Sequence, residues 1–152
     1  RGSALENEAV AAYEFDQECV TEKVGFVLDD SRQWGCSPDR FVGEDGLLEV
    51  KCVSASNHIA ALLGLLDDDH VSQIQGQLMV TGRRWCDLWF YNPMLPAHRI
   101  RIYRDEEHVG QLHEAVQAFC YRVNTMHAQL LGDSPAMAAG TDGMEPVAKV
   151  QP

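Results

Sequence analysis

A short apolar run in the first half of the chain contains two opposite charges, and it constrains the fold more than any other segment. Residues 47–53 read LLEVKCV, so Glu49 and Lys51 are two positions apart among strand-forming side chains. On a β-strand such a pair points to one face, while Val50 between them points the other way, into a core. Unpaired charges on a buried strand are costly, so packing alone does not explain the pair. The run therefore predicts a buried strand with a polar site on one face.

A third charged residue, Asp39, precedes this strand. It follows a Ser-Pro dipeptide at 37–38, where proline fixes the chain direction, and turn-forming residues 44–46 separate it from the strand. Asp39 and Glu49 offer carboxylate oxygens, and the Val50 carbonyl offers a third oxygen. Oxygens of this kind are the ligands that Mg²⁺ prefers. The arrangement therefore indicates a magnesium-dependent phosphodiesterase, with these three groups as the metal ligands.

Lys51 has two compatible roles in this interpretation. A metal held nearby polarises a phosphoryl oxygen and lowers the pKa of a bound water. Lys51 would orient that water or neutralise charge that develops on the phosphorus, and it can also pair with Glu49. The spacing by itself is a weak signal, because a Glu-x-Lys arises by chance in roughly one chain in two or three of this length. The alternative is a surface hairpin with an ordinary Glu–Lys pair.

The bulk composition indicates one ordinary globular domain. The chain has 152 residues, of which 45% are hydrophobic and 23% charged, and no run reaches the length of a membrane span. Its five cysteines are odd in number and scattered, which favours buried free thiols in a reducing compartment over disulfides or a zinc site. The net charge of −11 predicts weak non-specific affinity for DNA. The chain begins at Arg1, and we expect that the natural protein has a segment before it.

Hydrophobic periodicity and turn residues assign the remaining elements. We predict helices over residues 4–15, 58–66, 69–80 and 106–131, and strands over residues 24–28, 34–36, 47–53, 85–91 and 98–103. The strands at 34–36 and 47–53 are expected to form a hairpin around the loop at 43–46. This order of elements predicts an α/β fold with a central mixed sheet. Residues 133–152 lack periodicity and are predicted to be a flexible tail.

Several other side chains have more than one interpretation. Gln73, Gln75 and Gln77 lie on the helix at 69–80, and a solvated polar face is expected for Gln75 and Gln77. Arginines at 83, 84, 99, 101 and 104 either line a DNA channel or a subunit interface, or belong to an ordinary surface. The aromatic strand that contains Trp85, Trp89, Phe90 and Tyr91 is expected in the core. For Trp34 the sequence leaves open whether the side chain is in the core or stacks on a base. Residues 62–66 are expected in the core or at a contact between subunits.

Four ordered blocks of the sequence resemble the YqaJ-type viral recombinase family, which includes phage lambda exonuclease. The blocks are ALENEAVAAYEF, GCSPDRFVGEDGLLEVKC, VSQIQGQLMVTGRRWCDLWFYNP and IYRDEE. The resemblance covers about residues 1–131. It implies a restriction-endonuclease-like α/β core, with a central mixed sheet flanked by helices. It also implies two Mg²⁺ ions, for which Mn²⁺ can substitute, 5′-to-3′ degradation of one strand of double-stranded DNA, and a homotrimer.

The resemblance also assigns roles to individual residues. Asp39 corresponds to the aspartate that touches both metals, Glu49 and the Val50 carbonyl to the other protein ligands, and Lys51 to the catalytic lysine. Glu6 in LENEA corresponds to a helical glutamate near the nucleophilic water. Gln73 in SQIQ corresponds to a helical glutamine that contacts the water or the substrate.

One position departs from the family pattern. Arg40 stands where the family commonly has glycine; it reaches a DNA phosphate or is simply exposed, and exposure is favoured. Arg83 and Arg84 are the other candidates for DNA contact. The family segment that helps to bind a 5′ phosphate would lie before Arg1.

The resulting prediction is an exonuclease domain over residues 1–132, followed by the tail. It would act on double-stranded DNA ends in phage-type recombination. Its expected partner is a single-strand annealing protein, and its location is the cytoplasm of a bacterial host, with no membrane association. The alternatives are an endonuclease or Holliday-junction resolvase on the same catalytic core, or a non-catalytic DNA-binding subunit.

Overall fold

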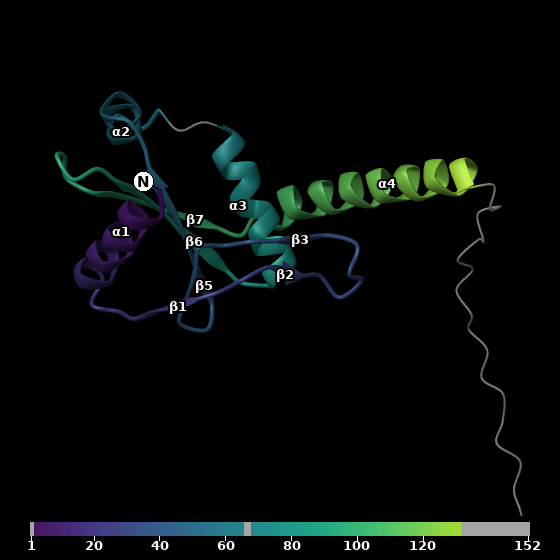
Figure 1. The fold of residues 1–152 in the computed structure, drawn as a ribbon, viewed down its shortest axis with the longest axis horizontal. Helices are drawn as coiled ribbons and strands as arrows, with labels where there is room; N and C mark the ends of the chain where they lie inside the picture. The colour runs from purple at the N-terminus through teal and green to yellow at the C-terminus, as the bar shows by residue number, and fades with distance from the viewer. Residues whose placement is uncertain (1, 66–67, 132–152) are drawn as a thin grey trace, which may run out of the picture. The chain divides into compact units, whose positions relative to one another are not determined.

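A computed structural model describes residues 2–65 and 68–131 of the chain (Figure 1). The chain divides into two compact units, residues 1–117 and residues 118–152. The second unit is described as far as the end of helix α4 (Glu106–Leu131). The predicted tail at 133–152 lies outside the described residues. Among the described helices, none is both long and apolar enough to span a membrane.

The first unit is built on a five-stranded mixed sheet, which confirms the predicted fold class. Its strand order is β1-β4-β5-β6-β7. The strands are β1 (Thr21–Lys23), β4 (Arg40–Val42), β5 (Gly46–Cys52), β6 (Trp85–Tyr91) and β7 (His98–Tyr103). Only the β5–β6 pair is parallel, with Glu49 opposite Leu88 and Lys51 opposite Phe90; the other pairs in this sheet are antiparallel.

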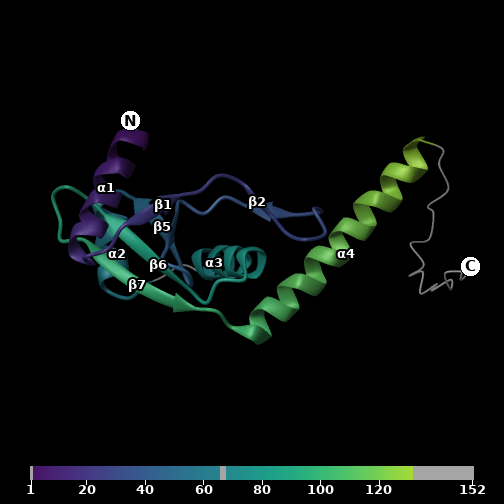
Figure 2. The ribbon, with the colours of Figure 1, turned by 90° about the horizontal axis from the view of Figure 1, so that it is seen from below.

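The parallel pair requires a crossover connection, and two helices provide it. They are α2 (Ala55–Leu62) and α3 (Asp68–Thr81) (Figure 2). Ser54 begins α2, because its hydroxyl accepts a hydrogen bond from the Asn57 amide. On this face of the sheet a core forms from residues of both helices and both strands, including Leu47, Ile74, Leu78 and Leu88.

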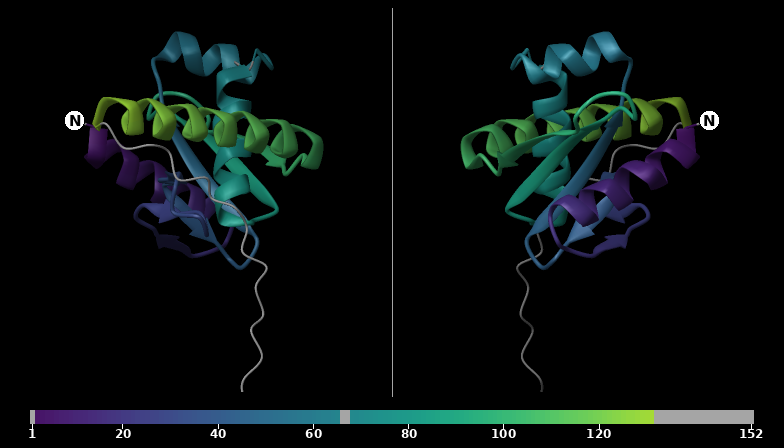
Figure 3. Two further views of the ribbon diagram at one scale, coloured as in Figure 1. Left: turned by 90° about the vertical axis from the view of Figure 1, so that its right-hand side faces the viewer. Right: turned by 90° about the vertical axis from the view of Figure 1, so that its left-hand side faces the viewer.

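The opposite face of the sheet is covered by helix α1 (Gly2–Asp16), drawn in purple in Figure 3. Ala9, Val10 and Tyr13 of this helix pack against Leu48 and Trp89. The Trp89 indole also donates a hydrogen bond to the Ala9 carbonyl, at 3.0 Å. Helix α1 is thereby fixed directly on β5 and β6, the two strands at the centre of the sheet.

The predicted hairpin between 34–36 and 47–53 is wrong. Strand β5 pairs instead with β4, and the turn that contains Gly43, with a φ of 55°, connects them directly. Residues 35–36 form β3 (Gly35–Cys36), which pairs with β2 (Val27–Leu28) in a separate two-stranded sheet. A Cβ at Gly35 would lie 2.4 Å from the Val27 carbonyl oxygen, so this close pairing depends on glycine. Of the predicted strand at 24–28, only β2 (Val27–Leu28) forms, and β1 (Thr21–Lys23) lies before the predicted range.

The segment at 58–66 also differs from expectation. Helix α2 begins three residues earlier than predicted, because the Ser54 cap sets its start, and it ends at Leu62. Leu62, Leu63 and Leu65 are exposed, so the expectation that they lie in the core is wrong, while a contact between subunits stays a prediction. Leu66 lies outside the described residues. The helices predicted at 69–80 and 106–131 are confirmed by α3 and α4.

The aromatic strand and the cysteines follow the predictions in part. Trp89 and Phe90 are buried, and Trp85 and Tyr91 are half-buried against the same cluster as Trp89. All five cysteines are free thiols, but only Cys86 is buried. Trp34, which the sequence left open, meets the His113 ring edge-on at 5.5 Å between ring centroids.

Candidate active site

Glu49 is the centre of a hydrogen-bonded cluster between β5 and α3. Its side chain is nearly buried, with the residue 6% exposed. One carboxylate oxygen, Oε1, accepts hydrogen bonds from Lys51 Nζ at 2.9 Å and from Gln73 Nε2 at 2.8 Å. The other, Oε2, accepts from Gln77 Nε2 at 2.9 Å. Both oxygens of this carboxylate are therefore fixed by donors.

The local structure explains why these side chains meet. Glu49 and Lys51 alternate with Val50 along β5, so both point toward the α3 face, as the strand pattern predicts. Gln73 and Gln77 are one turn apart on α3, which places both amides over the strand. Lys51 Nζ also donates to Gln73 Oε1 at 3.0 Å, which closes the cluster.

Asp39 lies beside this cluster. Its Oδ2 accepts the Val50 backbone N–H at 2.7 Å, so the loop that precedes β4 is joined to the strand that holds Glu49. Burial raises the pKa of the Asp39 carboxyl; the nearby charges of Glu49 and Glu6 raise it further, while the Val50 hydrogen bond and Lys51 oppose the change. Negative charge is thus concentrated at a half-buried position, where a cation would stabilise it.

The groups present suit a hard cation. Asp39, Glu49 and the Val50 carbonyl are all oxygen donors, as Mg²⁺ requires. Within residues 2–65 and 68–131, the structure has no cluster of three or more His, Cys, Asp and Glu side chains arranged to hold a metal. A metal bound to the Asp39 and Glu49 carboxylates would take its other ligands from the main chain, water or substrate, a pattern that is typical of Mg²⁺ sites.

Glu6 reaches the same neighbourhood from helix α1. Its carboxylate lies 3.9 Å from Arg40 Nη1, and its charge acts on the pKa of Asp39. Arg40 itself is buried, at 8% exposure, and donates to the Asp39 backbone carbonyl at 2.7 Å. The expectation that Arg40 is exposed is wrong. Arg40 lies on β4, and its Nη1 contacts both the Asp39 carbonyl and the Glu6 carboxylate.

Two glutamines expected on a solvated face are buried instead. Gln77, 4% exposed, holds Glu49, and its own Oε1 has no hydrogen-bond partner among the described residues. Gln75, 2% exposed, donates to the Tyr103 carbonyl at 2.8 Å and accepts from the Asp105 N–H at 3.0 Å. The one-turn spacing from Gln73 was the signal that could have identified Gln77, since both must face the same strand.

The other arginines lie away from Glu49. Arg83 stacks on the Phe41 ring at 3.8 Å and donates to the Gly43 and Gly46 carbonyls, at the amino end of β5. Arg84 is exposed, with its Nε 3.5 Å from an Asp45 oxygen. The structure therefore does not bring Arg83 and Arg84 to the Glu49 cluster, and their contact with DNA stays a prediction.

Comparison with known proteins identifies the family. The model of the YqaJ-like viral recombinase domain matches residues 1–84, more than half of the chain. The chain belongs to this family. All the candidate catalytic and metal-binding residues lie within the matched segment. A search of curated proteins gives no match.

Solved structures support the YqaJ-like assignment. An alkaline exonuclease (LHK-Exo) from Laribacter hongkongensis is 30% identical, with a TM-score of 0.65, over 84% of this chain and 73% of that one. The same protein in complex with dAMP matches at 30% identity and a TM-score of 0.66, over 84% and 72% of the two chains. A phage-related exonuclease from Haemophilus somnus 129PT shares the fold at 15% identity and a TM-score of 0.69, over 85% and 71%. These comparisons confirm the predicted family and the restriction-endonuclease-like α/β fold.

Proposed function

We propose that this YqaJ-like domain is a Mg²⁺-dependent exonuclease that degrades one strand of linear double-stranded DNA from a 5′ end. The observation that carries the proposal is the arrangement at β5. Glu49 is held at both oxygens, Lys51 donates to it at 2.9 Å, and Asp39 is hydrogen-bonded to the residue between them at 2.7 Å. The similarity to an alkaline exonuclease at 30% identity supports the same reaction class.

In this proposal two Mg²⁺ ions, which Mn²⁺ can replace, are held by Asp39, Glu49 and the Val50 carbonyl. When bound, the metal supplies a Lewis acid for the phosphoryl oxygen and a water of lowered pKa. The chain's own residues then position the reacting groups and neutralise the charge that develops on the phosphate. The Lys51 ammonium donates hydrogen bonds to Glu49 and Gln73. Its third N–H would donate a hydrogen bond to the scissile phosphate, and its charge would offset the charge that develops there.

Glu6 and Gln73 approach the reacting phosphate from two different helices. Gln73 accepts from Lys51 and donates to Glu49, so its amide orients both groups at once. Glu6 is partly exposed, with 40% of its side chain accessible, and its ion pair with Arg40 is long, at 3.9 Å. A carboxylate that is accessible and weakly paired is suited to accept a proton from an attacking water.

We infer the biological role from the family to which the chain belongs. Resection of one strand would expose a single strand for a single-strand annealing protein, in phage-type homologous recombination within the cytoplasm of a bacterial host. We infer a homotrimer as the assembled form. Threading of DNA through such a ring would make degradation processive.

The direct test is a time course on linear duplex DNA that carries a label at either the 5′ or the 3′ end. We expect Mg²⁺-dependent release of mononucleotides from the 5′-labelled end, and no release in EDTA. Lys51→Ala and Asp39→Asn should slow release by about 100-fold or more, whereas Lys23→Ala, at an exposed lysine on β1, should not slow it. Nicking of covalently closed circles would instead favour the endonuclease alternative.

A further inference from the structure

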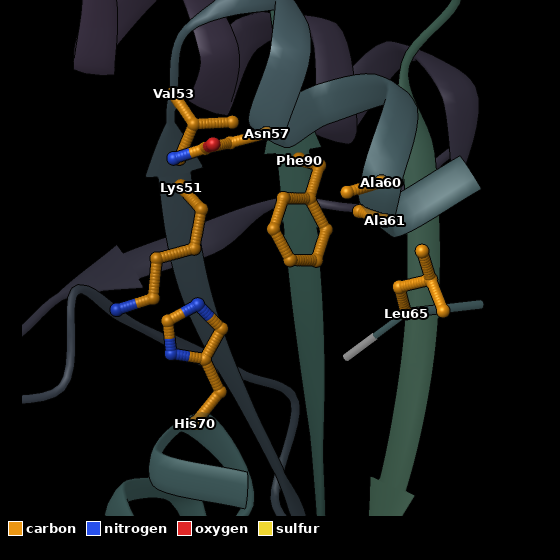
Figure 4. A pocket seen from close by; sticks show the side chains of 8 residues that line it. All are labelled: Lys51, Val53, Asn57, Ala60, Ala61, Leu65, His70 and Phe90. Atoms are coloured by element: carbon orange, nitrogen blue, oxygen red, sulfur yellow. The ribbon is translucent and has the colours of Figure 1, made fainter. Parts of the chain in front are cut away.

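Helix α3 lines a cavity that the proposed catalytic site does not account for. The pocket that Lys51 lines, shown in Figure 4, is adjacent to that site. The other cavity has a volume of about 390 Å³ and is lined by α3, by the hairpin of β2 and β3, and by the part of α4 that belongs to the first unit. Asp39, Glu49 and Lys51 are not among its lining residues.

The walls of this cavity are mainly apolar and carry no charge. Trp34 of the hairpin, Val80 of α3, and Leu112 and Val116 of α4 supply apolar surface, and none of the other lining residues is ionisable at neutral pH. An ionised ligand would lose its hydration here without gaining a partner of opposite charge. The cavity therefore favours an uncharged and largely apolar molecule.

One lining residue, Gln77, has a buried hydrogen-bond acceptor without a donor. Gln77 is 4% exposed, and its Nε2 donates to Glu49 Oε2 at 2.9 Å. An ionised carboxylate only accepts hydrogen bonds, so the amide nitrogen must face Glu49 and the amide oxygen must point away from it. That oxygen, Oε1, is buried and has no hydrogen-bond partner among the described residues. A ligand that brings a donor to Oε1 would remove the cost of leaving it unpaired.

The walls are held in place by contacts of the chain itself. The Trp34 N–H donates to Asp29 Oδ1 at 3.2 Å, and the Asp29 N–H donates to the Trp34 carbonyl at 3.1 Å, which closes the hairpin. The Trp34 ring meets the His113 ring edge-on, which joins the hairpin to α4. A preformed apolar cavity with a few polar groups, in this range of volume, is typical of a small-molecule site.

We propose that this cavity binds a small, uncharged aromatic molecule that donates a hydrogen bond to Gln77 Oε1, as the N–H of an indole or the O–H of a phenol can. The aromatic ring would pack against Trp34 and the aliphatic side chains of α3 and α4. This ligand is not a nucleotide, because a phosphate would find no cation among the lining residues. The site goes beyond the proposed nuclease function and does not depend on it.

The test compares two probes of nearly equal shape, indole and benzofuran. Benzofuran has an oxygen in place of the indole N–H, so it cannot donate a hydrogen bond and is the more apolar of the two. Calorimetry with the full chain, without DNA or metal, measures both dissociation constants. We expect indole to bind roughly fivefold more tightly, because it pairs the buried Oε1. Apolar contact alone would give the opposite order.

Two variants locate the binding site. Val116→Phe places a larger side chain in the cavity wall and should weaken indole binding by at least roughly tenfold. Val123→Phe is the matched control, since it makes the same substitution on the same helix at a residue that is 46% exposed, and it should bind indole like the unaltered chain. The side-chain amide signals of Gln77 in the NMR spectrum of the unaltered chain should shift with indole and much less with benzofuran.

The outcomes separate this site from the nuclease function. Absence of indole binding, or benzofuran binding as tightly as indole, would overturn the proposed site and leave the nuclease function standing. Indole binding that leaves the Gln77 amide signals unmoved would also overturn it, even where Val116→Phe does not fold. Selective binding of indole by a chain that cleaves no DNA would support the site and contradict the nuclease function alone.

Discussion

Two buried carboxylates on neighbouring parallel strands meet opposite electrostatic environments. Asp87 on β6 points to the α1 face, where Arg101 binds both its oxygens at 2.7 and 2.8 Å. Arg99 lies 3.5 Å away, and the Tyr13 hydroxyl donates at 2.7 Å. Two cations thus surround one fully buried anion, and Arg101 also stacks on the Trp85 ring at 3.8 Å.

Glu49 on β5 points to the α3 face, where negative charges outnumber positive ones. Among the described residues its one cationic hydrogen-bond partner is Lys51, and the other two donors are neutral amides. Asp39 and Glu6 add two more negative charges nearby, against Arg40. The Asp87 cluster is neutralised by the chain itself and serves stability, whereas the Glu49 cluster keeps an excess of negative charge that a metal ion would balance.

The largest expected effect separates the two clusters by activity. Lys51→Ala should lower the nuclease rate by about 10²- to 10³-fold, because it removes a cationic donor from the reacting phosphate. Asp87→Asn should leave the rate per folded molecule within about twofold, since its contacts are on the other face of the sheet. Single-turnover cleavage, normalised to the folded fraction, measures both; a large loss in Asp87→Asn would erase the distinction.

The next effect separates them by stability. Asp87→Asn should lower the free energy of unfolding by about 3 kcal/mol, because it leaves two arginines without their buried partner. The arginines are about a third exposed, which holds the cost at the lower end of the range for buried pairs. Urea unfolding monitored by tryptophan fluorescence measures it. Asp45→Asn, which removes the exposed pair with Arg84, should cost less than about 1 kcal/mol.

A smaller effect distinguishes two buried glutamines of the same helix. Gln77→Leu should raise the Mg²⁺ concentration needed for half-maximal thermal stabilisation by about tenfold, because Glu49 loses the donor that fixes its Oε2. Gln75→Leu breaks contacts with Tyr103 and Asp105 and should lower the melting temperature without changing the Mg²⁺ requirement. Equal Mg²⁺ requirements in both variants would show that Gln77 only packs.

These clusters also show what the sequence could and could not predict. The Glu49–Lys51 pair was predictable because alternation on a strand decides which side chains share a face. Asp87 stands in the same kind of run, WCDLWFY, yet its partners Arg99 and Arg101 lie on β7 and Tyr13 on α1. That pairing depends on strand order, which local patterns do not determine.

The incorrect hairpin has a similar origin. Residues 34–36 and 40–42 are both short and strand-like, and tertiary pairing decided between them. Buried amides were missed for a different reason. Glutamine is usually exposed, and Gln75 and Gln77 are buried only because the structure supplies each with a specific polar partner.

The smallest expected effect concerns a half-buried carboxylate, Glu14, which has no arginine or lysine hydrogen-bonded to it among the described residues. Glu14 accepts hydrogen bonds from the Thr21 hydroxyl and backbone N–H, both at 2.7 Å, and these bonds lower the pKa of its carboxyl below the usual 4.5. The unfolded chain therefore takes up this proton first as the pH falls. The contribution to stability is complete above the usual pKa and is lost as the pH falls through the lower pKa of the folded state.

Thr21→Val should accordingly cost about 0.5 kcal/mol near neutral pH, a low value because Glu14 is partly exposed and its charge is screened. The difference from the unaltered chain should shrink as the pH falls below 4.5, where the unfolded chain takes up the proton, and vanish once the folded protein is protonated at its lower pKa. Urea unfolding at several pH values between neutral and acidic measures this change. A difference that persists undiminished in acid would mean that Thr21 acts by packing, and that the charge of Glu14 contributes nothing to the junction between α1 and β1.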